Sequence, residues 1–228
     1  MRFNPLARKP ADQSVNRDEI IAAAAEVLQR NGYEAATMKD IAAAVNLTAA
    51  SLYHHFKNKD ALMLAVLEMG LDYILAKIQA IAHSDDPPDD KLHKMICEHI
   101  VSLTNNTAVG AAMVFEIRAL MNVKPPPANA SPADRADYEE FVARRDAFFT
   151  QRDQFEHVFR HVIREGIVRG VFREVDVPVF VKALLGAHNW VGVWYKPGGR
   201  LNGEQIAALT ANYFLAALSR DKTQHETT

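Results

Sequence analysis

Apolar residues recur at three- and four-residue intervals along most of the chain, which is the spacing of helices with one buried face. On residues 17–31 that face consists of Ile20, Ala24, Val27 and Leu28. Gly32 follows directly, where a helix end needs a residue that tolerates a left-handed conformation. No stretch shows the sustained two-residue alternation of a strand. The pattern predicts an all-α protein of about nine helices.

Capping residues and prolines mark where these helices begin and end. The predicted helices span residues 17–31, 37–45, 49–56, 59–83, 89–105, 107–123, 134–169, 176–195 and 202–219. Four prolines make residues 124–133 a loop, and Lys196-Pro197-Gly198-Gly199 forms a second firm break. The helix that begins at Asp134 is by far the longest.

Two of the predicted helices are short and lie close together. Thr37 and Asp40 have the spacing of a capping box, Thr48 caps the second helix, and Asn46 between them tolerates a left-handed turn. Such a unit is typical of a helix-turn-helix, whose second helix enters the major groove of DNA. The candidate DNA-binding residues are Thr37, Lys39, Thr48, Ala49, Ala50, Ser51, Tyr53, His54, His55 and Lys59.

Each of these residues also has a structural interpretation. Tyr53 could belong partly to the core, and His54 and His55 could simply face solvent. Lys39 could reach the DNA backbone, and Lys59 at a helix N-terminus could bind phosphate. Ile41, Leu52 and Phe56 have the periodicity of core positions.

Composition and charge exclude several classes of protein. The chain has 228 residues, 49% of them hydrophobic, which excludes a wholly disordered protein. Its net charge of −2 excludes a globally basic coat, although residues 1–17 carry four basic residues against Asp12. That arm could lie along a phosphate backbone or remain a solvated tail. No apolar run could span a bilayer or serve as a secretory signal, and Cys97 is the only cysteine, so we expect a cytoplasmic protein.

The string from Thr37 to Leu62 resembles the TetR family of bacterial repressors, most closely at Leu52-Tyr53-His54-His55-Phe56-Lys57-Asn58-Lys59. The resemblance implies a homodimer that binds a palindromic double-stranded DNA operator and is released by a small-molecule effector. It divides the chain into a DNA-binding domain, residues 1–60, and a ligand-binding and dimerisation domain, residues 61–228. Asn46 replaces the glycine that the family usually has, and Ala49 and Ala50 replace bulkier residues seen in some members.

The long predicted helix carries an aromatic stripe in which two arginines are embedded. The stripe consists of Phe141, Phe148, Phe155, Phe159 and Val162, and Arg145 and Arg152 share it. A buried arginine needs a partner, so either an ion-pair network or an anionic ligand is expected; Glu116 and Arg118 pose the same alternatives. The candidate ligand-binding residues are Arg118, Phe141, Arg145, Phe148, Arg152, Phe155, His188 and Trp190, with Arg164 and Arg173 nearer the rim.

The segment from His188 to Gly199 resembles a stretch of TetR-type regulators that respond to acyl-CoA thioesters of catabolic pathways. An acyl-CoA is therefore the expected effector, and an apolar drug-like ligand controlling an efflux or detoxification gene is the alternative. Trp190 and Trp194 could equally pack in a dimer interface. The candidate interface residues are Trp194, Leu209, Tyr213 and Phe214.

An enzyme is not expected, because no nucleophile elbow, phosphate loop or supported carboxylate pair occurs; no cofactor is expected either. Asp153, His157, His161 and Glu165 lie on successive turns and cannot all reach one metal ion, so a solvated polar face is the interpretation. Cys97, with His93 and His99 nearby, is interpreted as a small buried residue. A constitutive DNA-binding protein would have a filled C-terminal core, whereas a ligand-responsive one predicts a cavity lined by Phe148, Arg152 and Trp190.

Overall fold

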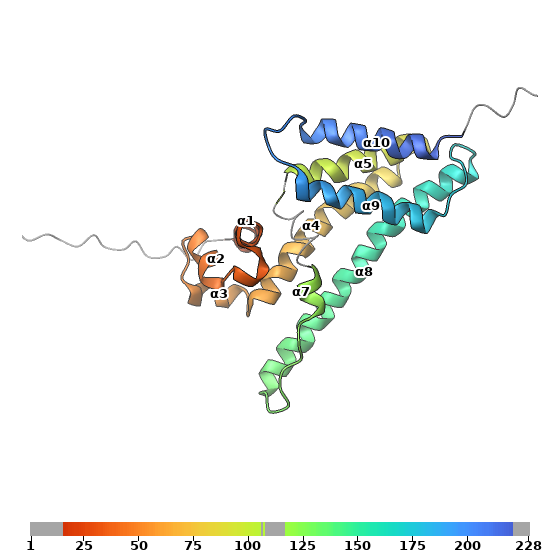
Figure 1. The fold of residues 1–228 in the computed structure, drawn as a ribbon. Helices are drawn as coiled ribbons and strands as arrows, with labels where there is room; N and C mark the ends of the chain where they lie inside the picture. Colours follow the sequence, from red (N-terminus) through yellow and green to blue (C-terminus); the bar gives the residue numbers. More distant parts are fainter. Residues whose placement is uncertain (1–15, 106, 108–116, 221–228) are drawn as a thin grey trace, which may run out of the picture. The chain divides into compact units, whose positions relative to one another are not determined.

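The computed structural model describes residues 16–105, 107 and 117–220, and every regular element within them is an α-helix (Figure 1). The helices are α1 (Arg17–Ala35), α2 (Met38–Ala44), α3 (Ala49–His55), α4 (Lys59–Ala82), α5 (Pro88–Asn105), α7 (Ile117–Met121), α8 (Pro132–Val168), α9 (Val177–Trp194) and α10 (Gly203–Leu218). The predicted all-α fold is confirmed. The basic arm before residue 16 and Glu116 lie outside the described residues.

The chain divides into two compact units, residues 1–66 and residues 67–228. In the first unit, α1 packs against α2 and α2 against α3. Ile20, Ile41 and Leu52 are completely buried there, and Phe56 is nearly so, as their periodicity predicts. This small core is what holds the two short helices in place, because helices of seven residues are not stable in isolation.

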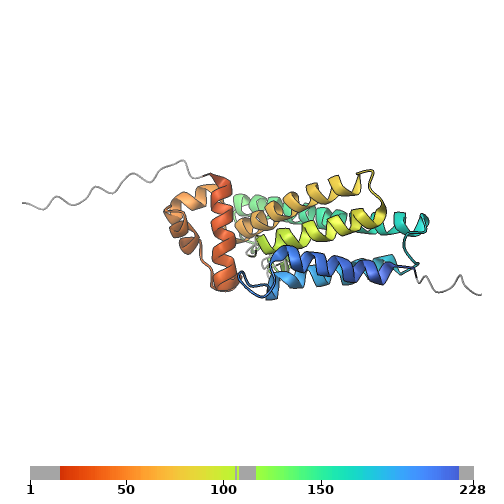
Figure 2. The ribbon, with the colours of Figure 1, turned by 90° about the horizontal axis from the view of Figure 1, so that it is seen from above.

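The second unit is a bundle of long helices. The helix α5 packs against α8, α9 and α10. The helices α5 and α10 lie side by side in both views (Figures 1 and 2), whereas α8 runs obliquely to them (Figure 1). The aromatic stripe of α8 faces this core: Phe141, Phe148, Phe155, Phe159 and Val162 are all buried. The 37 residues of α8 make it the longest helix described, about 55 Å at 1.5 Å per residue.

Local sequence signals locate most helix ends. Thr37 and Asp40 form the predicted capping box, and Asp176 and Asn202 cap α9 and α10. The predicted start of the long helix at Asp134 is wrong by two residues. Ser131 is its N-cap, Pro132 opens it, and Asp134 completes a capping box with Ser131. Proline is tolerated there because the first helical N–H has no intrahelical acceptor.

Two other boundaries differ from the prediction. The helix α1 continues to Ala35, with Gly32 at φ 73° as a break inside it. Of the helix predicted over 107–123, the structure describes Thr107 and α7, and residues 108–116 lie outside the described part.

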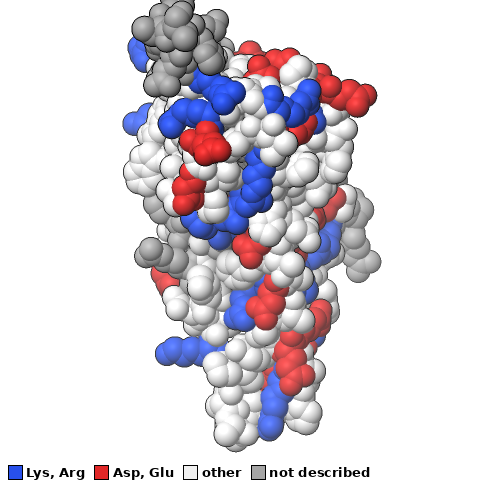
Figure 3. Space-filling view, turned by 90° about the vertical axis from the view of Figure 1, so that its right-hand side faces the viewer, with Lys and Arg blue, Asp and Glu red and all other residues white. Residues whose placement is uncertain are grey.

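The surface is of mixed charge. On the face shown in Figure 3, Lys and Arg side chains are interspersed with Asp and Glu, as the small net charge of the chain leads one to expect. Within the described ranges, none of the helices combines the length and the apolar character needed to cross a bilayer.

Candidate functional site

The turn between α2 and α3 is tightly built. Asn46 adopts φ 56°, and the backbone N–H of Leu47 donates to the carbonyl of Ala42 at 2.8 Å. A left-handed residue followed by a bond back to the helix is how many helices end, and asparagine accepts that conformation more readily than most residues. The chain is thereby turned from α2 directly into α3.

Both short helices are capped by threonine. The Thr37 hydroxyl accepts from the backbone N–H of Asp40 at 3.2 Å, and the Asp40 carboxylate accepts from the N–H of Thr37 at 3.1 Å. Hydrogen bonding from the Thr37 side chain and backbone lowers the pKa of Asp40. The Thr48 hydroxyl accepts from the N–H of Ser51 at 3.0 Å and bonds the Ser51 hydroxyl at 2.8 Å. These bonds hold the N-terminus of α3 in shape.

The predicted DNA-binding residues are mostly exposed on this unit. Leu52 and Phe56 anchor α3 in the core, which leaves its other face to solvent. Ala49 and Ser51 are half-buried, and the exposed members are Thr37, Lys39, Thr48, Ala50, Tyr53, His54 and His55. Hydroxyl, imidazole and ammonium groups on one helix-turn-helix can hydrogen-bond phosphates and base edges.

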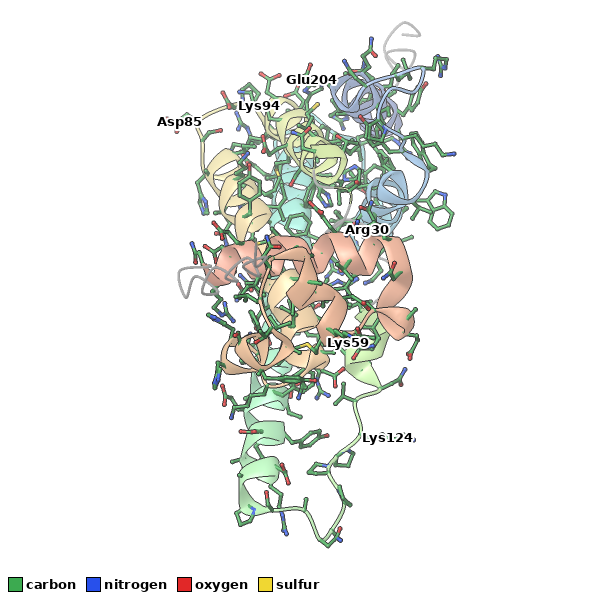
Figure 4. The ribbon with its side chains drawn as sticks, turned by 90° about the vertical axis from the view of Figure 1, so that its left-hand side faces the viewer. Arg30, Lys59, Asp85, Lys94, Lys124 and Glu204 are labelled. Atoms are coloured by element: carbon green, nitrogen blue, oxygen red, sulfur yellow. The ribbon has the colours of Figure 1, made fainter. Side chains whose placement is uncertain are left out.

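Lys59, which is predicted to bind phosphate, contacts the end of α1 in the structure. Its ammonium donates to the carbonyls of Tyr33 at 2.6 Å and Ala36 at 3.1 Å, and lies 4.2 Å from the centre of the Tyr33 ring. The Tyr33 hydroxyl in turn bonds Asp60. Lys59, labelled in Figure 4, therefore caps the end of α1, where a cation is favoured by the helix dipole.

The second unit contains a cavity of about 650 Å³, a size typical of small-molecule sites. Residues of α4, α5, α8 and α9 line it. Its apolar wall includes Met69, Leu71, Ile74, Leu103, Phe155 and Leu185. The charged residues on its wall are Lys77, Glu98, Arg152, Asp153, Glu156 and Lys182.

Most of these charges are already paired. Lys77 bonds Glu98, which raises the pKa of the lysine. Glu156 bonds Arg160 and also accepts from Lys182 at 3.3 Å. Arg152 is exposed and makes no ion pair within the described residues. It is therefore the wall cation that is available to an anionic group.

The structure brings only two of the predicted ligand-binding residues onto the cavity wall, Arg152 and Phe155. Phe141 and Phe148 are buried in the core, because the same stripe faces different neighbours along its length. Arg145 bonds the adjacent Asp146 at 2.8 Å and does not line the cavity. The Arg118 side chain lies outside the described residues.

The structure places three further candidate ligand-binding residues away from the cavity wall. Trp190 is 57% exposed and does not line the cavity, so the cavity expected between Phe148, Arg152 and Trp190 is displaced toward α4 and α5. Arg173 donates to the carbonyl of Ala217 at 2.7 Å. Arg164 is exposed on α8 away from the wall.

A buried histidine pair was missed by sequence reasoning. His99 on α5 and His188 on α9 approach with 3.2 Å between their Nδ1 atoms, and both side chains are buried. Burial lowers the pKa of His99 to about 4 and that of His188 well below its usual value. The residues are 89 positions apart, so no local pattern could have paired them. Of the two, only His99 lines the cavity.

The predicted interface residues lie on α9 and α10 and are exposed apart from Phe214. Trp194, Leu209 and Tyr213 are exposed, together with Trp190. Phe214 is half-buried, with its ring 5.7 Å from Phe180 and 6.0 Å from His188. Exposed large apolar side chains on two helices are what a protein interaction surface would need.

The residues considered for a metal serve other contacts. Glu165 accepts from Lys91 at 3.1 Å and Arg169 at 2.9 Å, and His157 and His161 face solvent. Within the described ranges, no group of three or more ligand-type side chains could hold a metal ion. Cys97 is half-buried, 3.8 Å from His93 Nδ1, and burial raises the pKa of its thiol.

Comparison with known families matches both parts of the chain. Residues 20–66 match the family described as bacterial regulatory proteins, tetR family. Residues 139–218 match the family described as tetracyclin repressor-like, C-terminal domain. The first range contains the helix-turn-helix, and the second contains most of α8 with α9 and α10.

Individual relatives cover nearly the whole chain. The transcriptional repressor KstR2 of Mycolicibacterium smegmatis is 28% identical over 86% of this chain and 87% of its own length. The solved regulator PfmR of Thermus thermophilus is 28% identical, with a TM-score of 0.70 over 89% of this chain and 100% of its own. AibR, solved in complex with isovaleryl coenzyme A and operator DNA, is 25% identical, with a TM-score of 0.65 over 89% of this chain and 97% of its own. Relatives of this kind are named regulators and repressors, not enzymes. The chain therefore belongs to the TetR family of transcriptional regulators.

Proposed function

We propose that the protein is a repressor that binds a palindromic operator as a homodimer and is released by an acyl-CoA thioester. The observation that carries the effector part is the cavity of about 650 Å³, which combines a largely apolar wall with the unpaired cation Arg152. An acyl chain suits the apolar wall, and the phosphates of coenzyme A suit the arginine. The relative solved with isovaleryl coenzyme A and operator DNA supports the same effector class.

On the DNA side, α3 would enter the major groove. Its exposed residues Ala50, Tyr53, His54 and His55 would meet bases and phosphates, with Thr37, Lys39, Thr48, Ala49 and Ser51 beside them. A dimer presents two such helices about 34–36 Å apart, one turn of DNA. The exposed surface formed by Trp190, Trp194, Leu209 and Tyr213 is the proposed dimer contact.

The helix α4 would carry the response. It begins at Lys59, directly after the helix-turn-helix, and its residues from Met69 to Lys77 line the cavity. A ligand that shifts this helix changes the spacing of the two α3 helices and so weakens operator binding. Coupling of this kind typically amounts to about 1–3 kcal/mol, or about 5- to 150-fold in affinity.

The test is fluorescence anisotropy of the purified protein on its own upstream DNA at fixed salt, with and without a panel of acyl-CoAs and their free acids. Release by a thioester but not by its acid supports the proposal. Arg152→Leu should weaken the response at least fivefold, whereas Arg164→Leu, on the same helix but away from the wall, should not. Tight DNA binding that no compound of the panel changes would support the repressor function and would rule out an acyl-CoA effector. Release by apolar drug-like compounds would then identify the alternative, a regulator of efflux or detoxification.

A further inference from the structure

The histidine pair places an imidazole at the cavity wall, and the hydrogen bond within the pair decides which of its nitrogens carries the proton. A neutral imidazole carries one N–H, on either Nδ1 or Nε2, and accepts at the other nitrogen. The Nδ1 atoms of His99 and His188 lie 3.2 Å apart, so one of them donates to the other. The direction of this bond decides which atoms the two rings present elsewhere.

The surroundings of His188 determine that direction. Its Nε2 is buried and has no hydrogen-bond partner among the residues that the structure describes. If His99 were the donor, His188 would carry its proton on Nε2, and a buried N–H would lack an acceptor. If His188 donates, its Nε2 is only an unused lone pair, and proteins tolerate a buried unpaired acceptor better than a buried unpaired donor. The proton of His188 therefore belongs on Nδ1.

His99 must then carry its own proton on Nε2. Unlike its partner, His99 is part of the cavity wall, and its Nε2 is not among the enclosed atoms that lack a partner. The ring packs edge to face on Phe155, with 5.0 Å between ring centres, and lies 6.5 Å from Phe159. These aromatic neighbours disfavour a charged imidazole, so the group offered to a ligand is a neutral N–H.

We infer that His99 is a specificity-determining residue that donates from Nε2–H to a carbonyl oxygen of the effector, and that His188 positions it by fixing its tautomer. The inference rests on the proposed effector site and assigns one group within it. A neutral donor in an apolar wall favours a neutral acceptor such as a thioester carbonyl, because a carboxylate would have to give up its hydration for an uncharged partner.

The tautomer can be measured without any ligand, by long-range proton–nitrogen NMR on the full-length protein with isotope-labelled histidine. We expect His99 protonated on Nε2 and His188 on Nδ1. In His188→Leu, which removes the donor, we expect His99 to populate both tautomers. Finding His99 protonated on Nδ1 in the wild-type protein would overturn the inference.

The ligand role is tested by comparing octanoyl-CoA with its S-octyl thioether, which lacks only the carbonyl oxygen. Wild-type protein should prefer the thioester by about 3- to 10-fold, the contribution of one net hydrogen bond. His99→Leu should abolish the preference, and His99→Gln, which keeps an N–H donor, should restore part of it. Ser102→Ala, at another polar wall position, should leave it unchanged. An equal preference in wild type and His99→Leu would contradict the inference.

Failure of the proposed acyl-CoA effector can be distinguished from failure of the role assigned to His99. Should neither CoA compound bind, the acyl-CoA proposal fails. The same ratio, measured with methyl nonyl ketone and undecane, then decides whether His99 selects a carbonyl.

Discussion

Lys91 on α5 places its ammonium 3.1 Å from a carboxylate oxygen of Glu165 on α8, and the lysine side chain is only 8% exposed. The two partners are not equivalent, because Glu165 also accepts from Arg169 at 2.9 Å and is 21% exposed. Lys91 makes no second salt bridge within the described residues, and the carboxylate of Asp86 interacts with it only from beyond salt-bridge distance. The ion pair therefore joins two bundle helices, and among the described residues it is the one salt bridge of Lys91, whereas Glu165 has two.

This asymmetry predicts unequal effects of neutralising each partner. Glu165→Gln leaves a buried ammonium without its salt-bridge partner and should lower the free energy of unfolding by about 2 kcal/mol. Lys91→Met leaves Glu165 with Arg169 and fills the space with an apolar side chain, so it should cost less than about 1 kcal/mol. Urea denaturation of both variants checks the order, and equal losses would contradict it.

The left-handed conformation of Asn46, at φ 56°, predicts how two substitutions at this position change stability. Asn46→Gly should change the free energy of unfolding by less than about 0.5 kcal/mol, because glycine adopts the left-handed region freely. Asn46→Ala should lose about 1 kcal/mol, because a Cβ strains that conformation. Denaturation midpoints check both variants, and an alanine variant as stable as wild type would show that the turn is not needed.

The histidine pair predicts a pH dependence of stability. The folded-state pKa of His99 lies at about 4, below the ordinary 6.5 that the unfolded chain has, and the pKa of His188 is also lowered. Between these values the unfolded chain binds protons that the folded chain does not. The contribution of the neutral pair to the free energy of unfolding is therefore complete above pH 6.5. It falls as the pH drops toward 4, by up to about 1.4 kcal/mol per pH unit for each histidine.

The measurement is urea denaturation between pH 7 and about pH 5, a range above the ordinary titration of aspartate and glutamate. The double variant His99→Gln/His188→Asn should lose much of the slope in this range. The matched control is His54→Gln/His55→Gln, which replaces two exposed histidines of α3 and should keep it. A wild-type curve flat across the range would contradict the assignment of a buried neutral pair.

The sequence predicts what is decided locally. Thr37, Thr48 and Asn202 cap helices because a short hydroxyl or amide satisfies a nearby N–H wherever the chain goes next. The burial of Phe148 and Phe155 follows in the same way from their spacing on one helix face. Ser131 has the same local signal and could have been found, because Ser131 and Asp134 are three residues apart.

The cavity could not be located in this way. Phe148 and Phe155 are seven residues apart on one face, yet of the two only Phe155 lines the cavity. Lys59 and the carbonyl of Tyr33 are 26 residues apart, so the sequence showed a cation at a helix start but not the carbonyls it would bind. Which faces meet depends on packing between distant segments, and a local pattern of residues does not show it.

The exposed apolar residues of α9 and α10 predict that the protein is a dimer held together through these two helices. Trp194→Asp combined with Leu209→Asp places two charges in the proposed interface and should shift the protein from dimer to monomer at micromolar concentration, because a buried unpaired charge costs several kcal/mol. Val168→Asp, a substitution of the same kind at an 86% exposed apolar residue of α8, is the control and should remain dimeric. Analytical ultracentrifugation distinguishes the states, and a dimeric double variant would place the interface elsewhere.

Lys39 and Lys59 provide the sharpest test of the DNA-binding surface, since both are lysines of the first unit with different surroundings. Lys39 is exposed one residue after the start of α2, whereas the Lys59 ammonium bonds the end of α1. Lys39→Ala should weaken operator binding and reduce the slope of log affinity against log salt by about 1, because one phosphate contact is lost. Lys59→Met should lower stability while leaving that slope unchanged. Anisotropy titrations across a salt series measure both slopes. If only Lys59→Met reduced the slope, the phosphate-binding lysine would be the one that the contacts assign to helix capping, and the proposed DNA-facing surface would be wrong.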